Sequence, residues 1–187
     1  MSDIIRPSLI ALFLLMLCSA GLQAQHGNHA QHGNAHAGAQ DAGAVPPGLI
    51  EEHRVIHEEL AALLDVPGEV GSAAQELAEL LHHHFPAENQ LAIPPLGWLV
   101  PLASGSTPPG VDAMIAKTDS LRAAMPQMLA EHRHIHAAAK QLRAAGVAGG
   151  NDAAVVFAEK LLAHAQHEEE VLYPAAILVG DLLRERK

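Results

Sequence analysis

The sequence carries one histidine-rich hexapeptide twice: residues 52–57 read EHRVIH, and residues 131–136, 79 positions later, read EHRHIH. A histidine, a glutamate and a proline also recur, 80 positions apart: His84, Glu88 and Pro94, then His164, Glu168 and Pro174. A chance repeat in a chain rich in Ala and Leu would match on Ala and Leu, whereas this repeat matches on side chains that bind metals. Two repeated αα-hairpins close naturally into a bundle. The repeat therefore predicts an all-α fold, an antiparallel up-down-up-down four-helix bundle.

The composition supports helices and limits the function. Apolar residues make up 49% of the chain and aromatic residues only 3%. Ala and Leu cost least in helices, while the aromatic and β-branched residues that strands prefer are scarce. A length of 187 residues suits one domain with a real core. The net charge of −10 argues against a nucleic-acid partner, because phosphates require a basic face.

Four helical segments can be read after residue 46, at about 47–64, 72–91, 112–145 and 151–172. Pro126 is expected to kink the third segment or split it in two, and Pro174 to break the fourth before a last helical stretch. Asn151 or Asp152 should cap the fourth segment. A Pro/Gly-rich loop at about 92–111 joins the second segment to the third.

The first 24 residues are typical of an export signal. Arg6 precedes an apolar run at 9–17, which is too short for a comfortable bilayer span, and cleavage is predicted near Ala24. The mature protein would then be periplasmic or secreted, without a membrane span. It would also lack cysteine, because Cys18 is the only one in the chain. Lipidation of Cys18 is the alternative, although Leu17 before it matches such sites poorly.

Residues 25–47 are predicted to form a disordered tail, because Gly, Asn, Ala and Gln cannot bury a core. Its histidines either scavenge metal weakly or belong to a merely soluble linker: His26, His29, His32 and His36. The folded domain is expected to cover residues 48–187.

Histidines and glutamates from the repeat lie on the apolar faces of the predicted helices. They are His53, His57, His84, Glu88, His132, His136, His164 and Glu168. A buried carboxylate has to be paired, protonated or coordinated to a metal. One inward histidine is more often a hydrogen-bonded core residue, but here all four helices bring such residues to one face. The pattern predicts a metal site, and two ions fit two carboxylates and at least four histidines better than one. Without thiolates, the ligands suit iron, manganese or zinc more than copper(I).

From about residue 49 to 183 the chain resembles the hemerythrin-like, or HHE cation-binding, family. The matching stretches are EEHRVIH, LHHHFPAENQLAIPPL, LAEHRHIH and LLAHAQHEEEVLYPAAI. The resemblance implies a non-haem di-iron centre bridged by two carboxylates and an oxo or hydroxo group. It implies as ligands His53, His84, Glu88, His132, His164 and Glu168, with His136 added as in the oxygen-carrying hemerythrins.

Two features depart from the family pattern. Asn89 follows Glu88 where family members often have a second carboxylate. Pro86 lies between His84 and Glu88, where it removes a backbone donor and is expected to bend the helix at the site.

Four further side chains have lesser claims on the site. His57 mirrors His136 and is either an eighth ligand or a core histidine, and His167 lies close enough in register to reach the site edge. His134 is expected to face solvent or a neighbouring helix. Tyr173 could hydrogen-bond near the metals, but packing at a helix end is the preferred interpretation.

Three classes of function remain open for the predicted centre: reversible binding of dioxygen or nitric oxide, a di-iron oxidoreductase acting on peroxide, oxygen or nitric oxide, and storage or buffering of metal. Few ionisable groups accompany the ligands in the apolar core, so the protons that release peroxide would be scarce. An enzyme would also need a reductant, whereas the His-rich tail modestly favours storage. We therefore expect a non-enzymatic protein that binds dioxygen or another small diatomic ligand.

Overall fold

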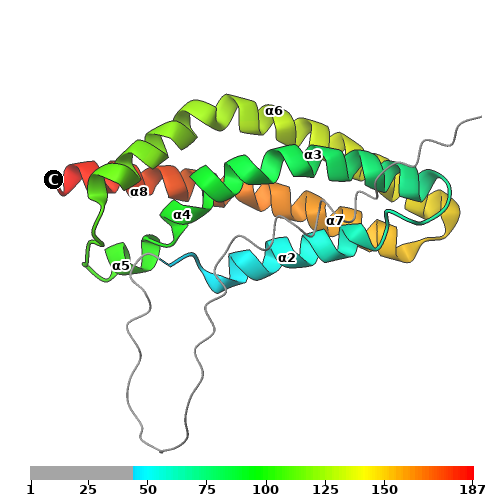
Figure 1. Ribbon diagram of the computed structural model, residues 1–187, viewed down its shortest axis with the longest axis horizontal. Coiled ribbons are helices and arrows are strands. Elements are labelled where there is room, and N and C mark those ends of the chain that lie inside the picture. The colour runs from blue at the N-terminus through cyan, green and yellow to red at the C-terminus, as the bar shows by residue number, and fades with distance from the viewer. Residues whose placement is uncertain (1–43) are drawn as a thin grey trace, which may run out of the picture. The chain divides into compact units, whose positions relative to one another are not determined.

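Helices make up the regular structure of residues 44–187, the part of the chain that the computed structural model describes (Figure 1). These residues contain no strand, which confirms the all-α prediction. The longer helices are α2 (Pro47–Ala61), α3 (Glu69–Leu91), α6 (Val111–Gly149), α7 (Asp152–His167) and α8 (Tyr173–Glu185). The shorter elements are α4 (Ile93–Leu96), α5 (Leu99–Ala103) and the π-helical turn η2 (Glu168–Leu172). The expected export signal, and the tail up to residue 43, lie outside the described residues.

Several helix boundaries differ from the predicted ones for local reasons. α3 begins at Glu69, directly after Gly68, whose φ of 84° lies in the left-handed region that favours glycine. The connection at 92–111 is not one open loop, because α4 and α5 form within it. Pro94 occupies the first turn of α4, where a missing N–H costs nothing.

The two internal prolines act differently: Pro126 lies inside one continuous helix, and Pro174 lies at the start of a separate last helix. α6 continues through Pro126, so the predicted alternative of a split helix is wrong, and Figure 1 shows α6 bent partway along its length. Pro174 lies in the first turn of α8, and the chain passes from α7 through η2 into α8. The Tyr173 N–H bonds to the carbonyl of Glu168, five residues earlier, as a π-helical turn requires.

The turn between α6 and α7 follows the capping rules. Gly150 has a φ of 64° and ends α6 in the left-handed conformation. The Asn151 side chain then accepts a hydrogen bond from the Ala154 N–H at 3.0 Å. Of the two predicted cap residues, Asn151 is the one used.

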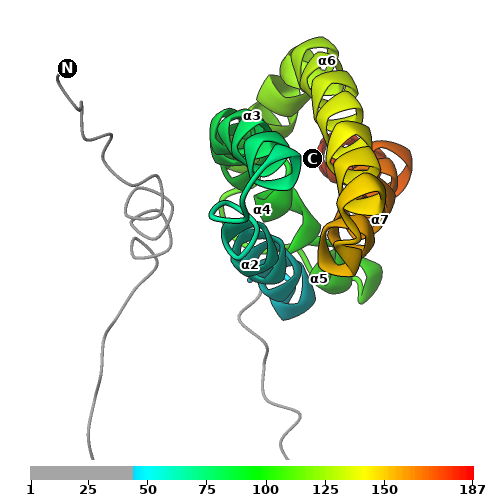
Figure 2. The same cartoon turned by 90° about the vertical axis from the view of Figure 1, so that its right-hand side faces the viewer.

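α6 organises the packing, because α3, α7 and α8 all lie against it (Figures 1 and 2). α2 packs against α7, and α4 against α8. Large apolar side chains from each long helix are fully buried between them: Ile56, Leu60, Leu77, Leu81, Leu121, Met128, Ile135, Leu142, Leu161 and Leu183. Within residues 44–187, none of the helices has the length and apolar character needed to cross a bilayer.

The segment around α5 is held at the end of this core by Trp98. Its indole ring is 6% exposed and belongs to a cluster with Leu102, Met114, Val179 and Leu183. The cluster joins the α4–α6 connection to α8, so the connection is packed rather than loose.

α6 and α8 approach each other closely at Gly180. A Cβ built there would lie 2.7 Å from Thr118 Cβ and would also collide with Thr118 Oγ1. Thr118 is 1% exposed and donates its hydroxyl to the Ile115 carbonyl, so it has little freedom to move away. The contact therefore requires glycine.

We expect Gly180→Ala to lower the free energy of unfolding by about 1–3 kcal/mol, the usual cost of overpacking a filled core. Chemical denaturation followed by circular dichroism measures it. Gly48→Ala in α2 is the matched control, because nothing lies within 4 Å of the added methyl group. The control should be neutral or slightly stabilising, since alanine favours helix. Equal effects of the two substitutions would contradict the close approach.

Candidate metal centre

Six of the predicted ligands come together in the core from five helical elements. Each is at most 8% exposed. They are His53 on α2, His84 and Glu88 on α3, His132 on α6, His164 on α7 and Glu168 on η2. The helical register places them there, because each lies one or two turns from fully buried apolar residues of its own helix.

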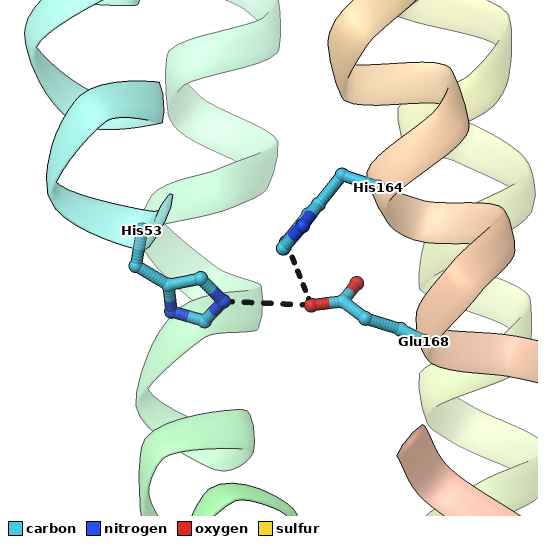
Figure 3. Close-up of side chains that lie close together, drawn as sticks. All are labelled: His53, His164 and Glu168. Carbon is cyan, nitrogen blue, oxygen red and sulfur yellow. Dashed lines mark hydrogen bonds and ion pairs between the residues drawn. The ribbon is translucent and has the colours of Figure 1, made fainter. Parts of the chain in front are cut away.

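The first subsite consists of His53, His164 and Glu168 (Figure 3). Glu168 Oε1 lies 2.8 Å from His164 Nε2 and 3.4 Å from His53 Nε2. One donor atom from each of the three side chains falls within 4.8 Å of the others. The three side chains could therefore bind one ion together.

The second subsite consists of His84, His132 and the same Glu168. His84 Nε2 and His132 Nε2 are 2.9 Å apart, and His132 Nε2 lies 3.6 Å from Glu168 Oε2. Glu168 thus turns Oε1 to the first subsite and Oε2 to the second. A carboxylate held in this way can bridge two ions.

Glu88 lies between the two subsites as a second carboxylate. Its Oε2 is 3.7 Å from His53 Nε2 and 4.0 Å from His84 Nε2. This oxygen is buried and accepts no hydrogen bond from any described residue. An unsatisfied buried carboxylate oxygen is costly unless a cation or a proton satisfies it.

A second layer of carboxylates holds the outer nitrogens of three histidines. Glu131 lies 2.9 Å from His84 Nδ1, Glu169 lies 2.9 Å from His132 Nδ1, and Glu52 lies 3.2 Å from His164 Nδ1. Such partners fix the orientation and tautomer of metal-binding histidines. Glu52 and Glu131 immediately precede His53 and His132 in the two hexapeptides, so each serves a histidine of another helix.

The His84 and His132 rings meet at their Nε2 atoms. Burial raises the pKa of Glu131, but the hydrogen bonds with His84 and Gln127 together lower it overall. Burial and the adjacent His84 lower the pKa of His132, whose Nδ1 lies against Glu169. The two Nε2 atoms are only 2.9 Å apart. That arrangement suits a cation bound by both.

The first subsite contains a pair of oppositely charged side chains, His164 and Glu168. Burial lowers the pKa of His164, but Glu168 and Glu52, on its two ring nitrogens, raise it above the ordinary value overall. Burial raises the pKa of Glu168, yet His164 and His53 bring it well below the usual range. His164 and Glu168 therefore form an ion pair when no metal is bound.

The pKa of Glu88 is shifted in the opposite direction to that of Glu168. Burial, and then the negative charge of Glu168, raise the pKa of Glu88 well above the ordinary value. Without metal, Glu88 is therefore held as the neutral acid, and a metal ion has to displace its proton to bind.

The Tyr173 hydroxyl reaches the site, as the alternative of a hydrogen bond near the metals predicts. It is fully buried, and its hydroxyl donates a hydrogen bond to Glu88 Oε1 at 3.1 Å. Burial raises the pKa of Tyr173, and Glu88 and Glu168 raise it further, so the free side chain is a phenol. On an uninterrupted α-helix, residues five apart face about 140° away from each other, whereas the π-helical turn η2 aligns Tyr173 with Glu168.

The remaining candidates lie at the edge of the centre. His136 is half-buried, its ring centroid is 6.3 Å from that of His132, and its buried Nε2 has no hydrogen-bond partner among the described residues. His57 is half-buried against Phe85, with ring centroids 4.8 Å apart. His167 is exposed and belongs to neither subsite, and His134 is exposed as expected.

The donor set fits a redox-active or Lewis-acidic divalent or trivalent metal. It offers imidazole nitrogens and carboxylate oxygens and, among the described residues, no thiolate. Such ligands suit iron, manganese or zinc. The buried Glu88 oxygen without a hydrogen-bond partner and the close approach of His84 Nε2 to His132 Nε2 both favour a bound cation.

Comparison with known proteins identifies one family. Residues 47–176 match the family model for hemerythrin, described as the hemerythrin HHE cation binding domain. No curated protein and no solved structure matches the chain significantly. The matched region contains both subsites, all three outer carboxylates and Tyr173.

Glu88→Gln should separate metal loading from stability. Glutamine copies the neutral acid, so we expect the metal-free variant to keep or raise its melting temperature while its metal affinity falls by more than about tenfold. Calorimetry and metal titration measure the two effects. Glu79→Gln, on the exposed face of the same helix, is the control and should change neither. A clear loss of metal-free stability in Glu88→Gln would contradict a protonated Glu88.

Glu131→Ala tests the second layer of carboxylates. It removes the partner of His84 Nδ1, so we expect metal affinity to fall by about 10–100-fold with little change in the folded structure. Competition with a coloured chelator gives the affinity. Glu170→Ala is the matched control, because Glu170 is exposed and contacts Gln166. Equal affinities of the two variants would show that Glu131 does not orient His84.

Proposed function

The chain belongs to the hemerythrin family, and we propose that it holds two non-haem iron ions and binds dioxygen, or nitric oxide, reversibly. The observation that carries the proposal is Glu168: its Oε1 lies 2.8 Å and 3.4 Å from His164 and His53, and its Oε2 lies 3.6 Å from His132, which meets His84 in the second subsite. One bridging carboxylate with a histidine pair on each side calls for two ions.

We assign the ligands by subsite. His53 and His164 would hold the first ion, His84 and His132 the second, and Glu168 would bridge them. Glu88 would complete the bridge with an oxo or hydroxo group, and His136 is the next side chain able to reach an ion. When bound, the two irons would donate electrons reversibly to a small diatomic ligand.

The fold that we propose for this centre is an antiparallel up-down-up-down four-helix bundle of two repeated hairpins. α2 and α3 would form the first hairpin, and α6 and α7 the second, in accordance with the arrangement in Figures 1 and 2. The hexapeptides then stand on equivalent helices, α2 and α6.

The apolar surroundings of the two subsites favour reversible binding of a diatomic ligand over its catalytic reduction. Ile56, Ile135 and Leu161 each lie one helical turn from a subsite histidine, and each is at most 2% exposed. Apolar residues exclude the water that would deliver protons to a reduced ligand. An oxidoreductase is the second candidate, and the buried Tyr173 hydroxyl favours it, because this group could donate a proton within the site. Storage of metal, the third class, depends on the tail histidines, which lie outside the described residues.

We also propose that the protein works outside the cytoplasm, after removal of an export signal near Ala24. The apolar run at 9–17 and the net charge of −10 support an exported protein whose partner is a small diatomic ligand and not a nucleic acid. Manganese or zinc would be the alternative metals.

The deciding measurement is the iron content and visible absorption spectrum of the full chain with and without dioxygen. We expect two tightly bound irons per chain and an oxygen-dependent charge-transfer band that disappears under vacuum and returns in air. His164→Ala should lose at least one iron, whereas His134→Ala, with an exposed side chain, should lose none.

Other outcomes would replace this function. Irreversible bleaching, with turnover on adding a reductant, would establish the oxidoreductase. Absence of tight iron with retention of manganese or zinc would change the metal. Unchanged iron content in His164→Ala would overturn the ligand assignment.

A further inference from the structure

Tyr173 lies closer to the second subsite than a packing role requires. Its Oη is 3.0 Å from His132 Nε2 and 3.3 Å from His84 Nε2, and those two nitrogens are 2.9 Å apart. The three atoms thus form a nearly equilateral triangle. All three side chains are at most 1% exposed.

The size of this triangle matches a coordination shell. Neighbouring ligands at right angles on an octahedral ion, with bonds of about 2.1 Å, lie about 3.0 Å from each other. The three measured edges lie close to that value. The phenol has one proton, and this proton cannot serve Glu88 Oε1, His132 Nε2 and His84 Nε2 at the same time.

We propose that Tyr173 is a phenolate ligand of the ferric ion in the second subsite, completing one face of its coordination shell with His84 and His132. This assignment rests on the two-iron function proposed above. Phenolate oxygen is a hard anionic donor that suits ferric iron, as tyrosine ligation of haem iron also shows.

The local backbone geometry fixes the position of the Tyr173 side chain. η2 inserts the extra residue that brings Tyr173 onto the face of Glu168, and π-helical turns of this kind are frequent at functional sites. The ring is held between Leu96, Leu121 and Met128, among other residues of one buried cluster. The hydroxyl therefore has a fixed direction.

Coordination of Tyr173 is balanced in protons and electrons. The oxygen–hydrogen bond breaks and an oxygen–iron bond forms, while the iron stays ferric and no electron moves. The proton is released to solvent as the metal binds, because a coordinating side chain has to be deprotonated.

The assignment makes the two subsites chemically unequal. In the internal repeat, the residue equivalent to Tyr173 is Ile93, which is 8% exposed and has no donor atom in its side chain. The first subsite therefore has one protein ligand fewer. A free coordination position for a diatomic ligand would then lie at the first ion.

Resonance Raman spectroscopy of the full chain loaded with ferric citrate tests the assignment, after loosely bound iron is removed. Tyr173 is the only tyrosine in the chain, so any tyrosinate signal belongs to it. We expect a phenolate-to-iron charge-transfer band in the visible region, with enhanced tyrosine ring vibrations. Tyr173→Phe should lose the band and the vibrations, and should bind one of its two irons at least about tenfold more weakly.

Glu170→Gln is the matched control, because Glu170 is exposed and contacts Gln166. It should keep both irons and the tyrosinate vibrations. Two bound irons without tyrosinate vibrations in the unmodified protein would overturn Tyr173 ligation and leave the two-iron function intact. No tight iron at all would overturn both. If Tyr173→Phe fails to fold, the spectrum of the unmodified protein still decides.

Discussion

Two carboxylates, Glu88 and Glu168, lie almost without solvent contact in a core of leucine, alanine and isoleucine. The free energy of burying such groups is unfavourable unless positive charge or a proton compensates them. In the metal-free protein a protonated His164 compensates Glu168, and a proton neutralises Glu88. The placement of the surrounding histidines follows from this requirement. The same requirement makes metal binding and proton release one process.

The repeat and the 3.6-residue periodicity were sufficient to predict the helical fold and the burial of six inward-facing residues. The residue types after the loop predicted a cap at Asn151 or Asp152, of which Asn151 is the one used. What they could not predict depends on departures from ideal helices or on contacts between helices. The position of Tyr173 required the π-helical turn, which has no sequence signature at this level. The outer carboxylates, such as Glu131, looked like ordinary surface residues, because only tertiary packing brings them to a histidine. His167 lies close to the ligands in the helical register but is exposed. Closeness in register therefore did not predict the direction of its side chain.

The duplicated hairpin makes the centre nearly symmetric, and a few residues make it unequal. His53 and His164 in one subsite correspond to His132 and His84 in the other, and Glu52 corresponds to Glu131. The second half adds Glu169 and Tyr173, where the first half has Asn89 and Ile93. The two positions therefore differ in charge and in donor atoms. A symmetric scaffold modified in this way can hold one metal in a closed shell and leave the other accessible.

The π-helical turn η2 also ties the chemistry of the site to the packing of α8. If Glu168–Leu172 formed α-helical hydrogen bonds with the same number of residues, everything after it would rotate by about 100°. Tyr173 would leave the metal centre, and Ala176, Val179 and Leu183 would turn out of the core at the same time. Removing one residue from the turn would instead leave Tyr173 on the face of Glu168, because residues four apart on an α-helix share a face. The orientation of α8 and the position of the tyrosine therefore depend on the same extra residue.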